Sequence, residues 1–101
     1  MIEVSYLEKE SKIKTLEIKG HANYAKKGED IVCSAVSAIG VGGINSLKNI
    51  DAIDIICESG YIFVKGNALE SEYNQIVLTT MLTQLYTIEK SYGKFIKISK
   101  S

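Results

Sequence analysis

The chain has 101 residues, of which 46% are hydrophobic and 24% charged, and its twelve basic residues balance twelve acidic ones. This length and composition predict a single domain covering residues 1–101 that folds without disulfides or a structural metal. A net charge near zero removes the electrostatic attraction that dominates binding to nucleic acids and anionic membranes, so we expect no direct nucleic-acid or membrane partner.

The N-terminus has no basic segment followed by an apolar one, and the longest apolar run, residues 31–44, is interrupted by serines and glycines. This run is too short to span a bilayer, so we expect a cytoplasmic protein. In that compartment Cys33 and Cys57 are expected to be reduced thiols. One histidine and two cysteines without a Cys-x-x-Cys spacing do not form a zinc site, and we expect neither a metal nor another cofactor.

The first part of the chain has the pattern of a hairpin followed by a loop. Apolar and polar residues alternate over residues 2–6 and again over residues 15–19, which predicts two strands joined by a polar turn at residues 8–12. Residues 21–29 have no period and contain a glycine and two lysines. We expect them to form a mobile loop.

A helix is expected from residue 31 to about residue 49. One side of it carries large apolar residues: Val32, Val36, Ile39 and Leu47. A stripe of small residues consists of Ser34, Ala38 and Gly42, and would let another element approach closely. Each glycine inside a helix costs up to about 1 kcal/mol relative to alanine. The three glycines between residues 40 and 43 therefore require either compensating close packing or a shorter helix.

The remaining chain predicts a second hairpin, a second helix and a closing strand. Residues 52–57 and 61–66 are rich in β-branched and aromatic residues and are joined by a turn at residues 58–60, so Cys57 is expected to be a core residue. Ser71 is expected to cap a helix that runs to Tyr92, with Gly93 as its C′ stop.

Phe95, Ile96 and Ile98 complete the pattern as a short strand. The resulting order is ββαββαβ. It predicts an α+β fold in which two helices pack on one face of a mostly antiparallel sheet.

His21 and Cys33 are the strongest candidates for catalytic residues. If Asp30 is the N-cap of the first helix, the Cys33 sulfur lies beside free backbone N–H groups and the positive end of the helix dipole. An ordinary cysteine, with a pKa of about 8.5, is only about 3% thiolate at pH 7, and a helix N-terminus together with an imidazolium lowers that pKa. His21 is the single histidine and hence the expected base. Such a pair transfers acyl groups through a thioester.

Simpler interpretations remain open for each residue. In the run Ile-Val-Cys-Ser-Ala-Val, Cys33 can be a small buried hydrophobe. Ser37, one helical turn later, can orient His21, contact a substrate or bond back to its own helix. Asp30 can orient the imidazole, although capping alone explains an aspartate at this position.

Residues 20–37, which read Gly-His-Ala-x-Tyr-Ala-x-x-Gly-x-Asp-Ile-Val-Cys-x-Ala-Val-Ser, resemble the signature of the ribosomal-processing cysteine proteases, the Prp family. The resemblance extends over essentially the whole chain. It implies a homodimeric bacterial endopeptidase. Such an enzyme removes the N-terminal extension of a large-subunit ribosomal protein by cutting after a Phe-Phe pair.

Carried onto matching positions, the resemblance makes Cys33 the nucleophile and His21 the base, with Gly20, Asp30 and Ser37 as supporting or substrate-binding positions. The loop between His21 and Cys33 is then a cover that orders over the substrate. Ser34 departs from the family, which more often has alanine there.

Two other classes of function remain as alternatives. The chain could be a non-catalytic module that binds a ribosomal-protein segment and retains a buried cysteine and histidine. A thiol redox sensor requires a resolving cysteine, which only Cys57 could supply. A histidine in an exposed loop favours the protease, because a base that moves over a substrate belongs there.

Overall fold

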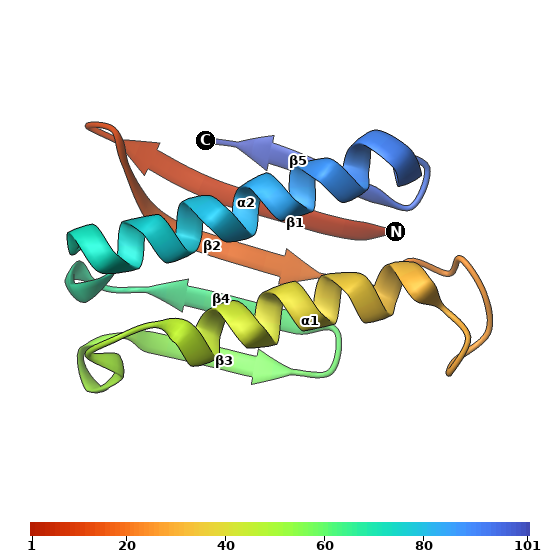
Figure 1. Cartoon of the computed structure of the whole chain (residues 1–101), viewed down its shortest axis with the longest axis horizontal. Coiled ribbons are helices and arrows are strands. Elements are labelled where there is room, and N and C mark those ends of the chain that lie inside the picture. The colour runs from red at the N-terminus through yellow and green to blue at the C-terminus, as the bar shows by residue number, and fades with distance from the viewer.

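The computed structural model describes all residues, 1–101, and places two helices on one face of a five-stranded sheet (Figure 1). The strands are β1 (Ile2–Lys9), β2 (Lys12–Lys19), β3 (Asp54–Glu58), β4 (Tyr61–Lys65) and β5 (Ile96–Lys100). The α-helices are α1 (Ile31–Ser46) and α2 (Glu72–Tyr92), and η1 (Ile50–Ala52) and η2 (Asn67–Glu70) are short 3-10 helices. The strand order is β3-β4-β2-β1-β5, and only β5 runs parallel to its neighbour. The predicted α+β fold with ββαββαβ order is confirmed.

The first hairpin turns more tightly than expected. β1 continues to Lys9 and β2 begins at Lys12, so the turn consists of only Glu10 and Ser11. Their φ angles are 53° and 64°. Positive φ at both central residues is typical of a type I′ turn, whose twist matches that of the flanking strands. A bulge between Leu7 and Glu8 shifts the register just before this turn.

Helix α1 differs from its prediction in its end and in the face that it buries. It ends at Ser46, and Leu47 is its extended C-cap, with the Leu47 N–H donating to the Ile44 carbonyl. Val32 and Val36 are buried as expected. The stripe of small residues is exposed, whereas Gly40 and Gly43 face Ile62 and Met81 so closely that a Cβ on either would overlap these side chains. Close packing therefore explains Gly40 and Gly43, whereas the earlier end of the helix explains none of the glycines, because all three precede Ser46.

The second half of the chain follows its pattern with two local differences. β3 begins only at Asp54, because residues 50–52 form η1. Ser71 caps α2 as predicted, its hydroxyl accepting from the Asn74 N–H at 3.2 Å. Helix α2 ends at Tyr92, but Gly93 has a right-handed φ of −61° instead of the left-handed conformation of a C′ glycine.

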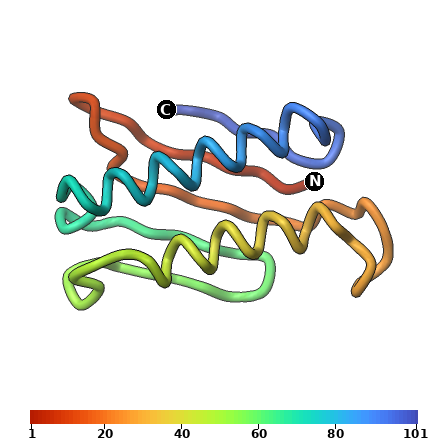
Figure 2. Tube along the Cα trace, viewed as in Figure 1, coloured from red at the N-terminus to blue at the C-terminus, as the bar shows by residue number.

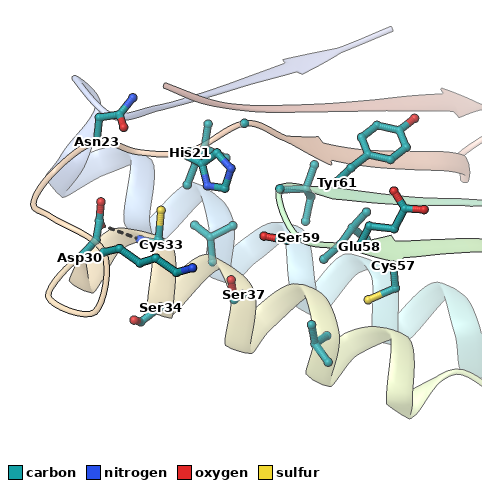
Figure 3. Close-up of a pocket in the computed structure, with 18 of the residues that line it drawn as sticks. His21, Asn23, Asp30, Cys33, Ser34, Ser37, Cys57, Glu58, Ser59 and Tyr61 are labelled. Carbon is teal, nitrogen blue, oxygen red and sulfur yellow. Dashed lines mark hydrogen bonds between the residues drawn. The ribbon is translucent and has the colours of Figure 1, made fainter.

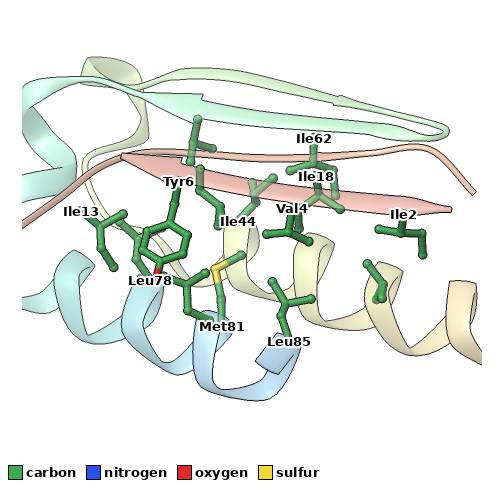
Figure 4. Close-up of a cluster of buried hydrophobic side chains, with 14 of the residues drawn as sticks. Ile2, Val4, Tyr6, Ile13, Ile18, Ile44, Ile62, Leu78, Met81 and Leu85 are labelled. Carbon is green, nitrogen blue, oxygen red and sulfur yellow. The ribbon is translucent and has the colours of Figure 1, made fainter. Parts of the chain in front are cut away.

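The core lies between the sheet and the two helices (Figure 4). It is formed by alternate residues of the strands and by the apolar stripes of both helices. Side chains with almost no solvent exposure include Val4, Leu16, Val64, Leu78, Leu85 and Ile96. No helix combines the length and hydrophobicity needed to cross a bilayer.

Three segments that are distant in sequence meet at one end of the sheet. Figure 2 shows the connection from β2 to α1 looping out at this end, near the β3–β4 turn and the C-terminal end of α2. The register of β2 and β4 brings Lys19 opposite Tyr61, and the Gly20 N–H donates to the Gly60 carbonyl at 2.9 Å. The backbone pairing of the sheet therefore fixes Gly20 next to the tip of the second hairpin.

Candidate active site

A cleft of about 740 Å³ lies between the β2–α1 loop, the first half of α1 and the β3–β4 turn. It contains every residue for which the sequence predicted a chemical role: Gly20, His21, Asp30, Cys33 and Ser37. Its apolar wall is formed by Ile2, Ile18, Val36, Val41 and Ile62. The cleft is therefore lined by a thiol, an imidazole and a carboxylate next to apolar side chains (Figure 3).

Asp30 joins the start of α1 to the loop that precedes it. One carboxylate oxygen accepts from the Cys33 N–H at 2.9 Å, and the other accepts from the Tyr24 N–H at 2.9 Å and the Ala25 N–H at 3.4 Å. The bond from the Cys33 N–H is the main cause that lowers the pKa of Asp30 below its usual value of 3.8, against the opposing effect of burial. The bond from the Cys33 N–H is the one that the capping interpretation of Asp30 requires.

The Cys33 side chain is half-buried at the N-terminal end of α1. Its sulfur accepts a hydrogen bond from the Ala22 N–H at 3.2 Å. A donor aimed at the sulfur and the positive end of the helix dipole together place partial positive charge beside the sulfur. The position is therefore electrostatically suited to a nucleophile.

The β2–α1 loop has no regular secondary structure but is attached at several points. Ala22 is only 3% exposed. The Tyr24 ring makes edge contacts with Tyr92 and Phe95, at centroid distances of 5.7 and 5.1 Å. These contacts hold the first half of the loop against the molecule, whereas residues 25–29 are exposed to solvent.

His21 is exposed in the same cleft as Cys33, yet no hydrogen bond connects the two side chains. The imidazole lies instead on the side of the β3–β4 turn (Figure 3), next to Gly60. The structure thus places the two side chains in one cleft without a direct hydrogen bond between them. Catalytic hydrogen bonds are often formed only once the substrate is bound.

Gly20 and Ser37 occupy different walls of the cleft. Gly20 has a φ of +96°, and a Cβ there would lie 2.5 Å from the Met1 carbonyl oxygen, so the position requires glycine. Ser37 and Ser34 are exposed on α1 and line the cleft beyond Cys33. Figure 3 shows the two serines on the same helix as Cys33.

The wall opposite α1 comes from the second hairpin, which sequence reasoning did not connect to the site. It is formed by Cys57, Glu58, Ser59, Gly60 and Tyr61. The Ser-Gly pair was recognisable as a turn, but its place beside His21 depends on the pairing of β2 with β4. The expectation that Cys57 is a core residue is wrong. Cys57 is exposed, because β3 is the edge strand of the sheet and has a neighbour on one side only.

No group of three or more histidine, cysteine, aspartate or glutamate side chains is arranged to hold a metal ion.

Comparison with known proteins identifies similar chains with a common activity. Residues 1–97 match the family described as "Cysteine protease Prp". The ribosomal processing cysteine protease Prp of Bacillus subtilis is 30% identical over 95 residues, covering 86% of this chain and 85% of the relative.

Two crystal structures of an essential ribosomal processing protease Prp from S. aureus have the same fold along the full length of both chains. The structure with a covalently linked product peptide is 29% identical and superposes with a TM-score of 0.91. The structure with a substrate peptide is 27% identical, with a TM-score of 0.82.

Proposed function

Because the chain belongs to the Prp family of cysteine proteases, we propose that it is an endopeptidase in which Cys33 is the nucleophile and His21 the general base. The observation that carries this proposal is the position of the Cys33 sulfur. It lies at the N-terminus of α1, accepts the Ala22 N–H and shares one cleft with the single histidine. A thiol with these neighbours is suited to covalent catalysis.

The proposed reaction proceeds through a thioester. His21 accepts the proton of the Cys33 thiol, and the thiolate attacks the carbonyl carbon of the scissile peptide bond. The tetrahedral intermediate collapses when the C–N bond breaks and His21 gives its proton to the leaving amine. Water then hydrolyses the thioester, losing a proton to His21, and the thiol is restored.

The supporting positions have separate roles in this scheme. Asp30 fixes the helix start and the loop through three backbone N–H groups, and so holds Cys33 in place. Gly20 keeps the chain before His21 close to Met1. Ser37 contacts the substrate through its exposed hydroxyl.

We assign as substrate the N-terminal extension of a large-subunit ribosomal protein, cut after a Phe-Phe pair. Ribosomal processing is the activity by which the relatives are described. The apolar wall formed by Ile18, Val36 and Ile62 suits large aromatic side chains. The exposed part of the loop, residues 25–29, covers a bound peptide and makes catalysis depend on binding energy. We place the enzyme in the cytoplasm, where ribosomal proteins are made.

The proposal is tested with a synthetic peptide that carries the Phe-Phe extension, a scrambled copy and mass spectrometry. We expect cleavage of the authentic peptide after the second phenylalanine only. Cys33→Ala should lower kcat/KM by at least about 1000-fold and His21→Ala by at least about 100-fold. Cys57→Ala is the control for loss of a thiol, because Cys57 lies at the far end of the cleft from His21 (Figure 3), and it should retain activity.

The alternative is a non-catalytic module that binds the same ribosomal-protein segment. It predicts that the authentic peptide binds but stays intact, or that Cys33→Ala yields the same products as the unmodified protein. Either result would refute the protease proposal.

A further inference from the structure

Gly60, at the tip of the second hairpin, lies directly against the His21 side chain. A Cβ added to Gly60 would lie 2.8 Å from Nε2 and 3.1 Å from Cε1 of the imidazole. Real Cβ atoms do not approach ring atoms so closely, so the ring occupies the space that any other residue at position 60 would fill. Gly60 also has a φ of +76°, which L side chains rarely adopt.

The main chain of His21 is held on both sides. The residue before it, Gly20, donates its N–H to the Gly60 carbonyl at 2.9 Å. The residue after it, Ala22, is buried and donates its N–H to the Cys33 sulfur at 3.2 Å. With both neighbours fixed, the imidazole changes position mainly by rotation of its own side chain. The surface that limits this rotation on the side away from Cys33 is the backbone of Gly60.

From these contacts we infer that Gly60 is a positioning residue for the general base, an inference that rests on the proposed roles of His21 and Cys33. The glycine provides the space in which the imidazole stands before it turns toward the thiol. In the proposed reaction the ring turns from Gly60 toward Cys33, and the proton passes from Sγ to an imidazole nitrogen. A methyl group at position 60 displaces the ring from this place and so weakens proton transfer.

The decisive variant is Gly60→Ala, assayed with the peptide substrate. We expect kcat to fall by about 10- to 100-fold, because a displacement of a catalytic group by about 1 Å has an effect of this size. KM should change much less. The pH dependence of the rate at which iodoacetamide alkylates Cys33 should become more like that of the His21→Ala variant. Cys57 in the same molecule is the internal reference, because it is exposed and distant from the imidazole (Figure 3).

A double-mutant cycle distinguishes this role from a general structural one. If Gly60 acts through the imidazole, adding Gly60→Ala to His21→Ala causes no further change in the alkylation of Cys33. Gly66→Ala is the control for strain in the same hairpin, because Gly66 also has positive φ (+137°) but contacts Ala52 and Ile53 outside the cleft. This control should lower stability without altering the alkylation profile.

An unchanged or higher kcat in Gly60→Ala, or an equal loss with and without His21, would overturn the inference. Activity of Cys33→Ala or His21→Ala would instead overturn the proposed function, so the two failures are distinguishable. If Gly60→Ala does not fold, the unmodified protein still provides a test. Its single histidine gives one set of imidazole NMR signals, and a nuclear Overhauser effect between the ring and the Gly60 Hα protons is expected. Its absence would also overturn the inference.

Discussion

At the scale of single residues, Asp30 shows how one carboxylate connects the start of a helix to the loop before it. Its two oxygens accept three backbone N–H groups, from Cys33, Tyr24 and Ala25. These bonds lower the pKa of Asp30 below 3.8, its usual value. A carboxyl with a lowered pKa in the folded state stabilises the protein above its unfolded pKa, and this contribution is lost as the pH falls through the folded pKa.

We therefore expect the free energy of unfolding to decrease below about pH 4 in part through Asp30. In Asp30→Asn the stability at neutral pH should be lower and its decrease in acid smaller, because an amide keeps only one acceptor oxygen and does not titrate. Urea unfolding followed by circular dichroism from neutral pH to about pH 2 measures both effects. Parallel pH profiles for the two proteins would show that Asp30 does not provide this stability.

The residues of the candidate site differ in how far their positions could be predicted from the sequence. Gly20, His21, Asp30, Cys33 and Ser37 lie in one short run, where capping and helix rules indicate their relative positions. The contact of Gly60 with His21 was not predictable, because it depends on the alignment of β2 with β4 across the sheet. Cys57 was misplaced because the apolar run before it has the pattern of a buried strand, whereas β3 lies at the edge.

At the scale of elements, two glycines let α1 pack closely, one against the sheet and the other against α2. Gly40 of α1 faces Ile62 in the sheet, and Gly43 faces Met81 of α2. Met81 is only 2% exposed and therefore has little room to move away from an added methyl group. Gly42, on the outer side of the same helix, has no atom within 4 Å of an added Cβ.

This difference between neighbouring glycines predicts opposite effects of the same substitution. Gly43→Ala should lower the free energy of unfolding by about 1–3 kcal/mol, because overpacking outweighs the better helix propensity of alanine. Gly42→Ala should raise the free energy of unfolding of the single chain by up to about 1 kcal/mol, since within one chain only helix propensity changes. Urea denaturation of both variants beside the unmodified chain measures the two values. A stabilised Gly43→Ala would show that α1 and α2 do not require this close approach.

Periodicity predicted the two α-helices, the five strands and the two hairpins, but neither the 3-10 helices nor the pairings that join the hairpins and β5 into one sheet. The cap of α2 at Ser71 and its end at Tyr92 were predictable, because capping and the helical repeat are local properties. The parallel pairing of β5 with β1 was not, because no local pattern indicates which strand a closing segment joins. The early end of α1 depends on Leu47, which leaves the helix and is buried in the core.

At the scale of the whole molecule, the helix layer has an outer groove of about 580 Å³ between α1 and α2. Ala38 and Gly42 form one side of it, and the exposed side chains of Tyr73 and Ile76 stand on the other. A stripe of small residues opposite large apolar ones permits close packing across a twofold axis. This surface is the one through which the proposed homodimer is expected to form.

Sedimentation equilibrium should accordingly give twice the chain mass of 11.1 kDa. Ile76→Glu should shift the protein toward the monomer, because a charge in an apolar interface is costly to bury. Ile50→Glu is the matched control: Ile50 is 53% exposed, compared with 61% for Ile76, and lies outside the groove. A monomer at high micromolar concentration, or equal effects of the two substitutions, would argue against this dimer.

The parallel pairing of β1 with β5 also has a consequence for how the molecule folds. The cleft is formed mainly by residues between Ile18 and Ile62, whereas β1 acquires its second neighbour only when residues 96–100 reach residues 2–6. Closing so long a loop is entropically expensive, and contacts of high sequence separation slow folding. Docking of the last strand is therefore expected to be the late step. Until it occurs, β1 is an open edge that another chain can pair with.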